Sequence, residues 1–260
     1  MKNILITLGI LLLTGNFLFA QHAHIITSGS VEFEKSVNTY AIIKKMLGNN
    51  IQGLTQQLYE QYQKTQPQFK VLKSTLTFDN DKTLFTPIEP ENNNSFTFMG
   101  DIPMGSQRNT IYTDLSAGTS INHKGFFDET YLLKDSLRKI KWKITDETRE
   151  VAGYTCRRAN ALILDSIYVV AFYTNEIHVS GGPESFTGLP GMILEVALPH
   201  DNVIWRATKV NDLTIAPNTI VPPKKGKAMT KKQFMDVFNS MLKNAGTGKR
   251  IDMLKLDYLL

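Results

Sequence analysis

Two kinds of side chain in this sequence could do chemistry by themselves: a carboxylate inside an apolar run and a single thiol. Glu195 lies within Met192–Leu198, where a carboxylate could act as an acid with a perturbed pKa, although a paired or a rim-exposed glutamate is the favoured interpretation. Cys156 is the only cysteine, and a thiol becomes a nucleophile only beside a base that ionises it. Because no such base is close in the sequence, the interpretation as a small buried apolar residue is favoured.

Histidines offer a metal site, but only a weak one. His22 and His24, one residue apart, could bind copper or zinc together with a freed amine. The remaining histidines, His123, His178 and His200, are widely spaced in the sequence, and chain ends are poorly ordered. No metal or cofactor site is therefore predicted, and whether His22 and His24 bind metal stays open. The Gly-x-Ser-x-Gly, His-Glu-x-x-His and phosphate-loop motifs do not occur in the sequence, so no catalytic residue is assigned.

The elements that must position these side chains are mainly strands. Short runs of β-branched and aromatic residues recur with turn residues between them, which is typical of an antiparallel sheet. The expected strands are 25–34, 69–78, 82–88, 109–115, 119–123, 126–134, 139–145, 154–164, 167–174, 192–198 and 203–210. In 139–145, Ile140, Trp142 and Ile144 alternate with lysines, which predicts one apolar and one cationic face.

Three amphipathic helices are predicted, at about 36–47, 51–64 and 231–245. Ser36 could cap the first helix, and Thr230 with Gln233 has the spacing of a capping box for the last. Apolar side chains follow one stripe of each segment, so each helix is expected to pack on the sheet.

The chain begins with the features of a secretory leader. Lys2 precedes the apolar run Ile4–Leu13, and Ala20 precedes Gln21, which predicts a signal peptide over residues 1–20. The run is too short to span a bilayer, so no transmembrane segment is expected in the mature chain. The predicted protein is exported, to the periplasm or the exterior, and forms one β-rich domain over residues 21–260.

Net charge and cysteine content limit the kinds of partner and cross-link that this chain is expected to have. The formal net charge of the 260-residue chain is +5, a modest excess for a protein expected outside the cell, so nucleic acid is excluded as a partner. A cationic surface facing anionic lipid is an alternative to an ordinary solvated face. With one cysteine, no disulfide can form within the chain.

These patterns predict an α+β, β-dominated fold: a curved antiparallel sheet with packed helices, in outline resembling the half-barrel of periplasmic lipoprotein carriers. One strand, 167–174, is apolar on both faces, as expected at the centre of a core or in the wall of a dry concavity.

The segment 180–196 combines glycines and prolines with a buried strand. One interpretation is a corner in which Gly182, Pro183, Gly188 and Gly191 supply the necessary backbone geometry. The other is the lip of a ligand-binding concavity. That lip would be formed by Phe186, Leu189, Pro190 and Met192.

The run Gly188–Glu195, GLPGMILE, resembles the signature of the GLPGLI family of exported Bacteroidetes proteins, with Met192 in place of leucine. Further matching features lie at Trp142, 153–156, 171–177 and 182–183. The resemblance implies export and a β-rich fold, and it supplies no catalytic residues because the biochemical role of that family is uncharacterised.

The function expected from these observations is non-enzymatic binding in the bacterial envelope. The ligand would be hydrophobic, such as a lipid or lipopeptide, or the partner would be an envelope protein. The alternatives are a hydrolase or peptidase-like accessory that uses Glu195, His178 or Cys156, and a structural accessory of an outer-membrane transporter.

Overall fold

A single open sheet of twelve strands dominates the computed structural model of this protein. The structure describes residues 25–48, 52–89, 102–126, 129–243 and 248–260. The strand order across the sheet is β12-β6-β5-β4-β3-β2-β1-β11-β10-β9-β8-β7. The strands are β1 (Ser28–Asn38), β2 (Phe69–Asp79), β3 (Lys82–Ile88), β4 (Asn109–Asp114), β5 (Thr119–Phe126), β6 (Glu129–Ser136), β7 (Lys143–Val151), β8 (Tyr154–Ile163), β9 (Ile167–Thr174), β10 (Met192–Leu198), β11 (Val203–Asp212) and β12 (Lys227–Met229).

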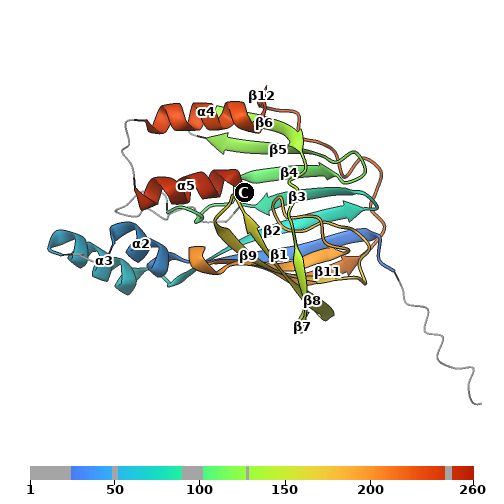
Figure 1. Cartoon of the computed structure of the whole chain (residues 1–260), viewed down its shortest axis with the longest axis horizontal. Helices are drawn as coiled ribbons and strands as arrows, with labels where there is room; N and C mark the ends of the chain where they lie inside the picture. The colour runs from blue at the N-terminus through green and yellow to red at the C-terminus, as the bar shows by residue number, and fades with distance from the viewer. Residues whose placement is uncertain (1–24, 49–51, 90–101, 127–128, 244–247) are drawn as a thin grey trace, which may run out of the picture.

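Neighbouring strands in this sheet are antiparallel, with the exception of β12, which pairs parallel to β6. Most strands pair with their neighbours in the chain, and β1 crosses to lie between β2 and β11. Figure 1 shows the sheet with helices gathered along one side. The predicted β-dominated α+β fold is confirmed, with an open sheet that is antiparallel except for β12. The expectation that each helix packs on the sheet is wrong for residues 54–65, where Leu54 is 70% and Leu58 37% exposed.

In the described residues four α-helices accompany the sheet: α2 (Thr39–Leu47), α3 (Leu54–Thr65), α4 (Lys231–Leu242) and α5 (Lys249–Leu259). The prediction that Ser36 caps the first helix is wrong. Ser36 pairs with Val71 and Ile204 inside β1, and the Asn38 side chain accepts from the Ala41 N–H instead. The cap of α4 does form, because Thr230 and Gln233 make both bonds of a capping box.

Several elements differ from the sequence prediction: β1 extends to Asn38, so the first helix begins at Thr39, and β12 was not predicted. The strand expected over 139–145 begins only at Lys143 and continues to Val151, and residues 139–142 belong to no strand or helix. Helix α5 was missed altogether: its N-cap is Gly248 with no side-chain hydrogen bond, so the usual start signal is lacking. The predicted leader, 1–20, lies outside the described residues, and none of the described helices is long and apolar enough to cross a membrane.

The main core lies between the helices and one face of the sheet. We call this the inner face and define it by Lys35 of β1 and Trp205 of β11, which are both buried. Helix α5 contributes Met253 and Leu256 to the same apolar cluster as Trp205. The opposite face of these strands, which carries Glu34 and Arg206, is the outer face.

Candidate functional site

Segment 180–196, which contains the GLPGMILE run and is called the signature segment below, makes a tight corner on the inner face. A Cβ at Gly191 would lie 2.0 Å from the carbonyl oxygen of Thr174, and one at Gly182 would lie 2.8 Å from that of Phe186. These contacts leave no room for a side chain, so both glycines are required by the close approach of other backbone. Pro183 is buried and Gly188 is exposed with a φ of +94°.

The residues predicted to form a ligand lip lie mostly inside the protein. Phe186, Leu189 and Met192 are at most 2% exposed, and only Pro190 is exposed. The Phe186 ring packs edge-on against Trp205 with a centroid distance of 6.1 Å. In this structure the three buried side chains contact the protein's own core, and their ligand-binding role remains a prediction.

Charged side chains are also buried on the inner face. The Lys35 ammonium donates to the Ser106 carbonyl at 3.1 Å and lies 5.0 Å from the Trp205 ring centroid. Beside it is a cavity of about 20 Å³, which is room for about one water molecule. Glu184, from the signature segment, lines the same cavity and accepts from the Asn109 amide at 3.1 Å.

Cations hold the last turn of α5. The Lys124 ammonium donates to the Tyr258 carbonyl at 2.7 Å, and both Lys231 and Arg138 donate to that of Leu259. Burial lowers the pKa of Lys124 to about 8 and that of Lys231 to about 8. Positive charge near a helix C-terminus is favourable because it opposes the helix dipole, so these bonds stabilise α5 on the inner face.

The outer face carries Glu195, the carboxylate that the sequence singled out. Its side chain is 3% exposed and is held by two guanidinium groups: Arg149 Nη1 donates at 2.7 Å and Arg206 Nε at 2.5 Å. The Arg149 guanidinium also stacks over Phe172, 3.7 Å from the ring centroid. A buried carboxylate with two charge-assisted partners is held firmly in place, so Glu195 is the paired glutamate of the two expected alternatives and is not exposed at a rim.

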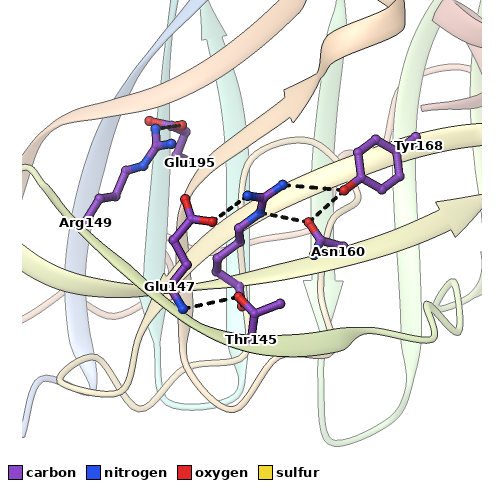
Figure 2. Close-up of polar contacts among 7 residues, drawn as sticks. Thr145, Glu147, Arg149, Asn160, Tyr168 and Glu195 are labelled. Carbon is purple, nitrogen blue, oxygen red and sulfur yellow. Dashed lines mark hydrogen bonds and ion pairs between the residues drawn. The ribbon is translucent and has the colours of Figure 1, made fainter.

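A polar network lies beside this ion pair on β7, β8 and β9 (Figure 2). Arg158 donates to Glu147 at 2.5 Å and to the Asn160 side chain at 3.0 Å. The Tyr168 hydroxyl donates to the same Asn160 oxygen at 3.1 Å. These planar side chains are therefore held in fixed positions by one another.

Cross-strand pairing places apolar residues next to these charges. Val71, Ser36, Ile204 and Ala197 are directly opposite one another across β2, β1, β11 and β10. Val71 is 49% exposed and Ile204 is 38% exposed, and Phe69, two residues before Val71, is 51% exposed. We call Phe69, Val71, Ala197 and Ile204, with Lys73 and Arg206 of the adjoining row, the outer patch.

The residues proposed for an enzyme do not assemble into a catalytic arrangement in the described part of the chain. Burial raises the pKa of the Cys156 thiol to about 12, so the reactive thiolate is disfavoured. His178 is exposed, and Glu195 is held by its two arginines. No group of three or more potential metal ligands was found among the described residues, and His22 and His24 lie outside them.

Part of the chain is similar to a known domain. Residues 109–236 match a family model described as the N-terminal domain of N-glycanase peptide. The matched segment includes β7 to β11, the strands that carry the ion pair and the polar network. Proteins that carry this domain are exported bacterial proteins. No curated protein matches the sequence significantly.

Solved structures of PNGF-II resemble the fold over most of this chain. In the P21 space group the TM-score is 0.51 at 15% identity, with 81% of this chain and 33% of that chain covered. In the C2 space group the values are 0.49 and 17%, with 80% and 32% covered. The chain thus spans about a third of the length of PNGF-II, and the likeness is one of fold.

Sequence reasoning missed the outer patch, although a signal for it was present. In Val203–Ala207, exposed Ile204 and Arg206 alternate with buried Val203, Trp205 and Ala207. The available signal was Ile204, an apolar residue on the solvent-facing side of a strand with alternating burial. The neighbours that turn it into a patch come from β2 and β10, and only the pairing of the strands reveals them.

Proposed function

We propose that this protein is an exported, non-catalytic binding module that docks on a partner of the bacterial envelope through its outer face. The observation that carries the proposal is the outer patch, where apolar side chains remain exposed beside a fixed cluster of charges. An exposed apolar surface rimmed by polar residues is typical of an interaction site. The similarity to the N-glycanase domain and the resemblance to the GLPGLI signature both support export.

The outer face is preferred to an interior ligand site because side chains of the protein itself fill the space next to the inner face. Carriage of a lipid or lipopeptide beside Phe186 and Leu189 would require helix α5 to leave, since Leu256 belongs to the same packed cluster. Native mass spectrometry of the purified mature protein tests whether a ligand is carried in the interior. A co-purifying apolar ligand that is lost in Phe186→Ala would favour carriage over docking.

Fractionation of cells that export the protein tests the docking proposal. We expect the wild-type protein to sediment with the envelope and the Ile204→Asp variant to appear in the soluble fraction. Met241→Asp is the matched control, because Met241 is 48% exposed but lies on α4. A wild-type protein that stays entirely soluble would contradict docking on the envelope.

A second candidate is an enzyme or enzyme accessory that acts on glycoproteins. The specific observation in its favour is the match to a domain of an N-glycanase. Incubation with an N-glycosylated protein, followed by mass spectrometry, would reveal loss of glycan mass. If activity is found and Glu195→Gln abolishes it without unfolding the protein, the enzymatic candidate replaces the binding module.

A further inference from the structure

The outer patch combines two features whose chemistry identifies the kind of partner it fits. Phe69, Val71 and Ile204 present apolar side chains that are about 40–50% exposed. The adjoining row of the sheet carries Lys73 and Arg206, whose side chains are 66% and 56% exposed. Because neighbouring strands are about 4.8 Å apart, the row from Val71 to Ala197 spans about 15 Å.

Cations outnumber carboxylates around these apolar residues. Glu195 is already held by Arg149 and Arg206, and Glu34 lies 3.9 Å from the Lys73 ammonium. In the rows of the outer face that contain Val71, Lys73 and Thr75, and on β7 beside them, the cationic side chains are Lys73, Lys143, Arg149, Arg158, Arg206 and Lys209, against the carboxylates of Glu32, Glu34, Glu147 and Glu195. The excess of positive charge is complementary to an anionic surface.

The form of the patch favours lipid over protein. A protein partner gains most of its affinity by filling pockets with a few anchoring side chains. Here the exposed apolar side chains project from β2 and β11, on either side of β1, with lysine and arginine next to them. Apolar side chains that enter the headgroup region, together with cations that attract anionic lipids, are how peripheral proteins bind a bilayer surface.

We propose that the outer patch docks the protein on the surface of an anionic phospholipid bilayer. Phe69, Val71 and Ile204 would enter the headgroup region, and Lys73 and Arg206 would contact lipid phosphates. This proposal rests on the proposed function, because it names the envelope partner of the same face. In this proposal the Arg206 guanidinium has two roles: its Nε donates a hydrogen bond to Glu195, and its remaining N–H groups would contact lipid phosphates.

Co-sedimentation with vesicles tests the proposal. The protein, purified after export, is mixed with vesicles of phosphatidylglycerol and phosphatidylcholine in equal parts, and separately with vesicles of phosphatidylcholine alone. We expect sedimentation with the anionic vesicles only, and loss of it as salt is raised, because salt screens exposed charges. Equal binding to both kinds of vesicle, or none to either, would overturn the proposal.

Variants assign the binding to the outer patch. Lys73→Gln is expected to weaken vesicle binding about fivefold, the usual contribution of one basic residue near an anionic surface. Ile204→Asp is expected to weaken it further, whereas Met241→Asp on α4 should bind as the wild type does. Thermal unfolding of each variant verifies folding, and Lys73→Gln keeps the test valid if Ile204→Asp is unstable. Vesicle binding unchanged in both patch variants would contradict the assignment.

The result separates this proposal from the proposed function. If the protein sediments with the cell envelope in an Ile204-dependent manner but ignores vesicles, docking stands and the lipid partner is wrong. Binding of soluble polyglutamate without binding to vesicles would identify an acidic protein partner in its place.

Discussion

The two faces of strand β11 differ in burial, although the residues that form them are adjacent in the chain. Trp205 is fully buried on the inner face under α5 and the signature corner, whereas Ile204 and Arg206 on either side of it are exposed on the outer face. The buried ammonium groups of the inner face, at Lys35 and Lys124, donate hydrogen bonds to backbone carbonyls. On the outer face, Glu195 is paired with arginine side chains that remain partly exposed.

This difference indicates where change is tolerated. Inner-face contacts join segments that are distant in the chain, so altering one disturbs several elements. The exposed outer-face side chains, such as Val71 and Ile204, also contact solvent, which can accommodate a substitution. A surface whose exposed apolar residues are not needed to fill the core is the better candidate for interaction with a partner.

The largest effect is expected at the signature corner. Gly191→Ala would place a methyl group 2.0 Å from the Thr174 carbonyl oxygen, and we expect it to lower the free energy of unfolding by roughly 4 kcal/mol or more. Urea denaturation measures the change. Gly118→Ala is the control, because Gly118 has a φ of +65° but nothing near its Cβ position, so about 1 kcal/mol is expected from backbone strain alone.

Phe186→Ala tests whether the predicted lip belongs to the core. Removing a fully buried ring that packs on Trp205 should cost about 3–5 kcal/mol of stability. Leu162→Ala, at a side chain that is 63% exposed, should change stability by less than about 0.5 kcal/mol. Equal thermal stabilities of the two variants would show that Phe186 is not a core residue.

Glu195→Gln should have an intermediate effect on the outer face. The amide keeps the shape of the side chain but loses two charge-assisted bonds, and we expect about 1–2 kcal/mol of destabilisation because Arg149 and Arg206 are exposed enough to be rehydrated. Chemical denaturation at low and high salt measures it. Arg206→Gln should cost less, because Arg149 still neutralises the carboxylate.

The buried lysines predict how stability depends on pH. The pKa of Lys124 is about 8 in the folded protein and 10.5 ordinarily, so between these values the unfolded chain binds a proton that the folded protein does not. This group therefore makes stability rise as pH increases from about 8 to about 10.5. Denaturation at several pH values should show a weaker rise in Lys124→Met than in the wild type, and identical slopes would contradict the assignment.

The smallest effect on stability is expected in the outer patch. Ile204→Asp should lower the free energy of unfolding by about 1 kcal/mol or less, since the side chain is partly exposed and the main loss is strand propensity. A loss as large as that of Phe186→Ala would show that the two faces are not energetically different.

Much of the strand pattern could be predicted from the sequence. The predicted bounds of 82–88, 167–174 and 192–198 are the observed bounds of β3, β9 and β10, because alternation and turn residues are local signals. Helix α5 could not be predicted, since it lacks a side-chain cap and is held by Lys124, Arg138 and Lys231, which are distant in the chain.

The sequence alone determined that segment 180–196 would turn sharply, because glycine and proline restrict or free the backbone wherever they occur. Only the tertiary structure decided that Phe186 and Leu189 face the core, because that depends on where α5 packs. The same holds for the outer patch: the types of Val71 and Ile204 are written in the sequence, but their adjacency follows from the pairing of β1 with β2 and β11. Strand pairing joins residues that are far apart in the chain, and local sequence patterns do not say which strands will pair.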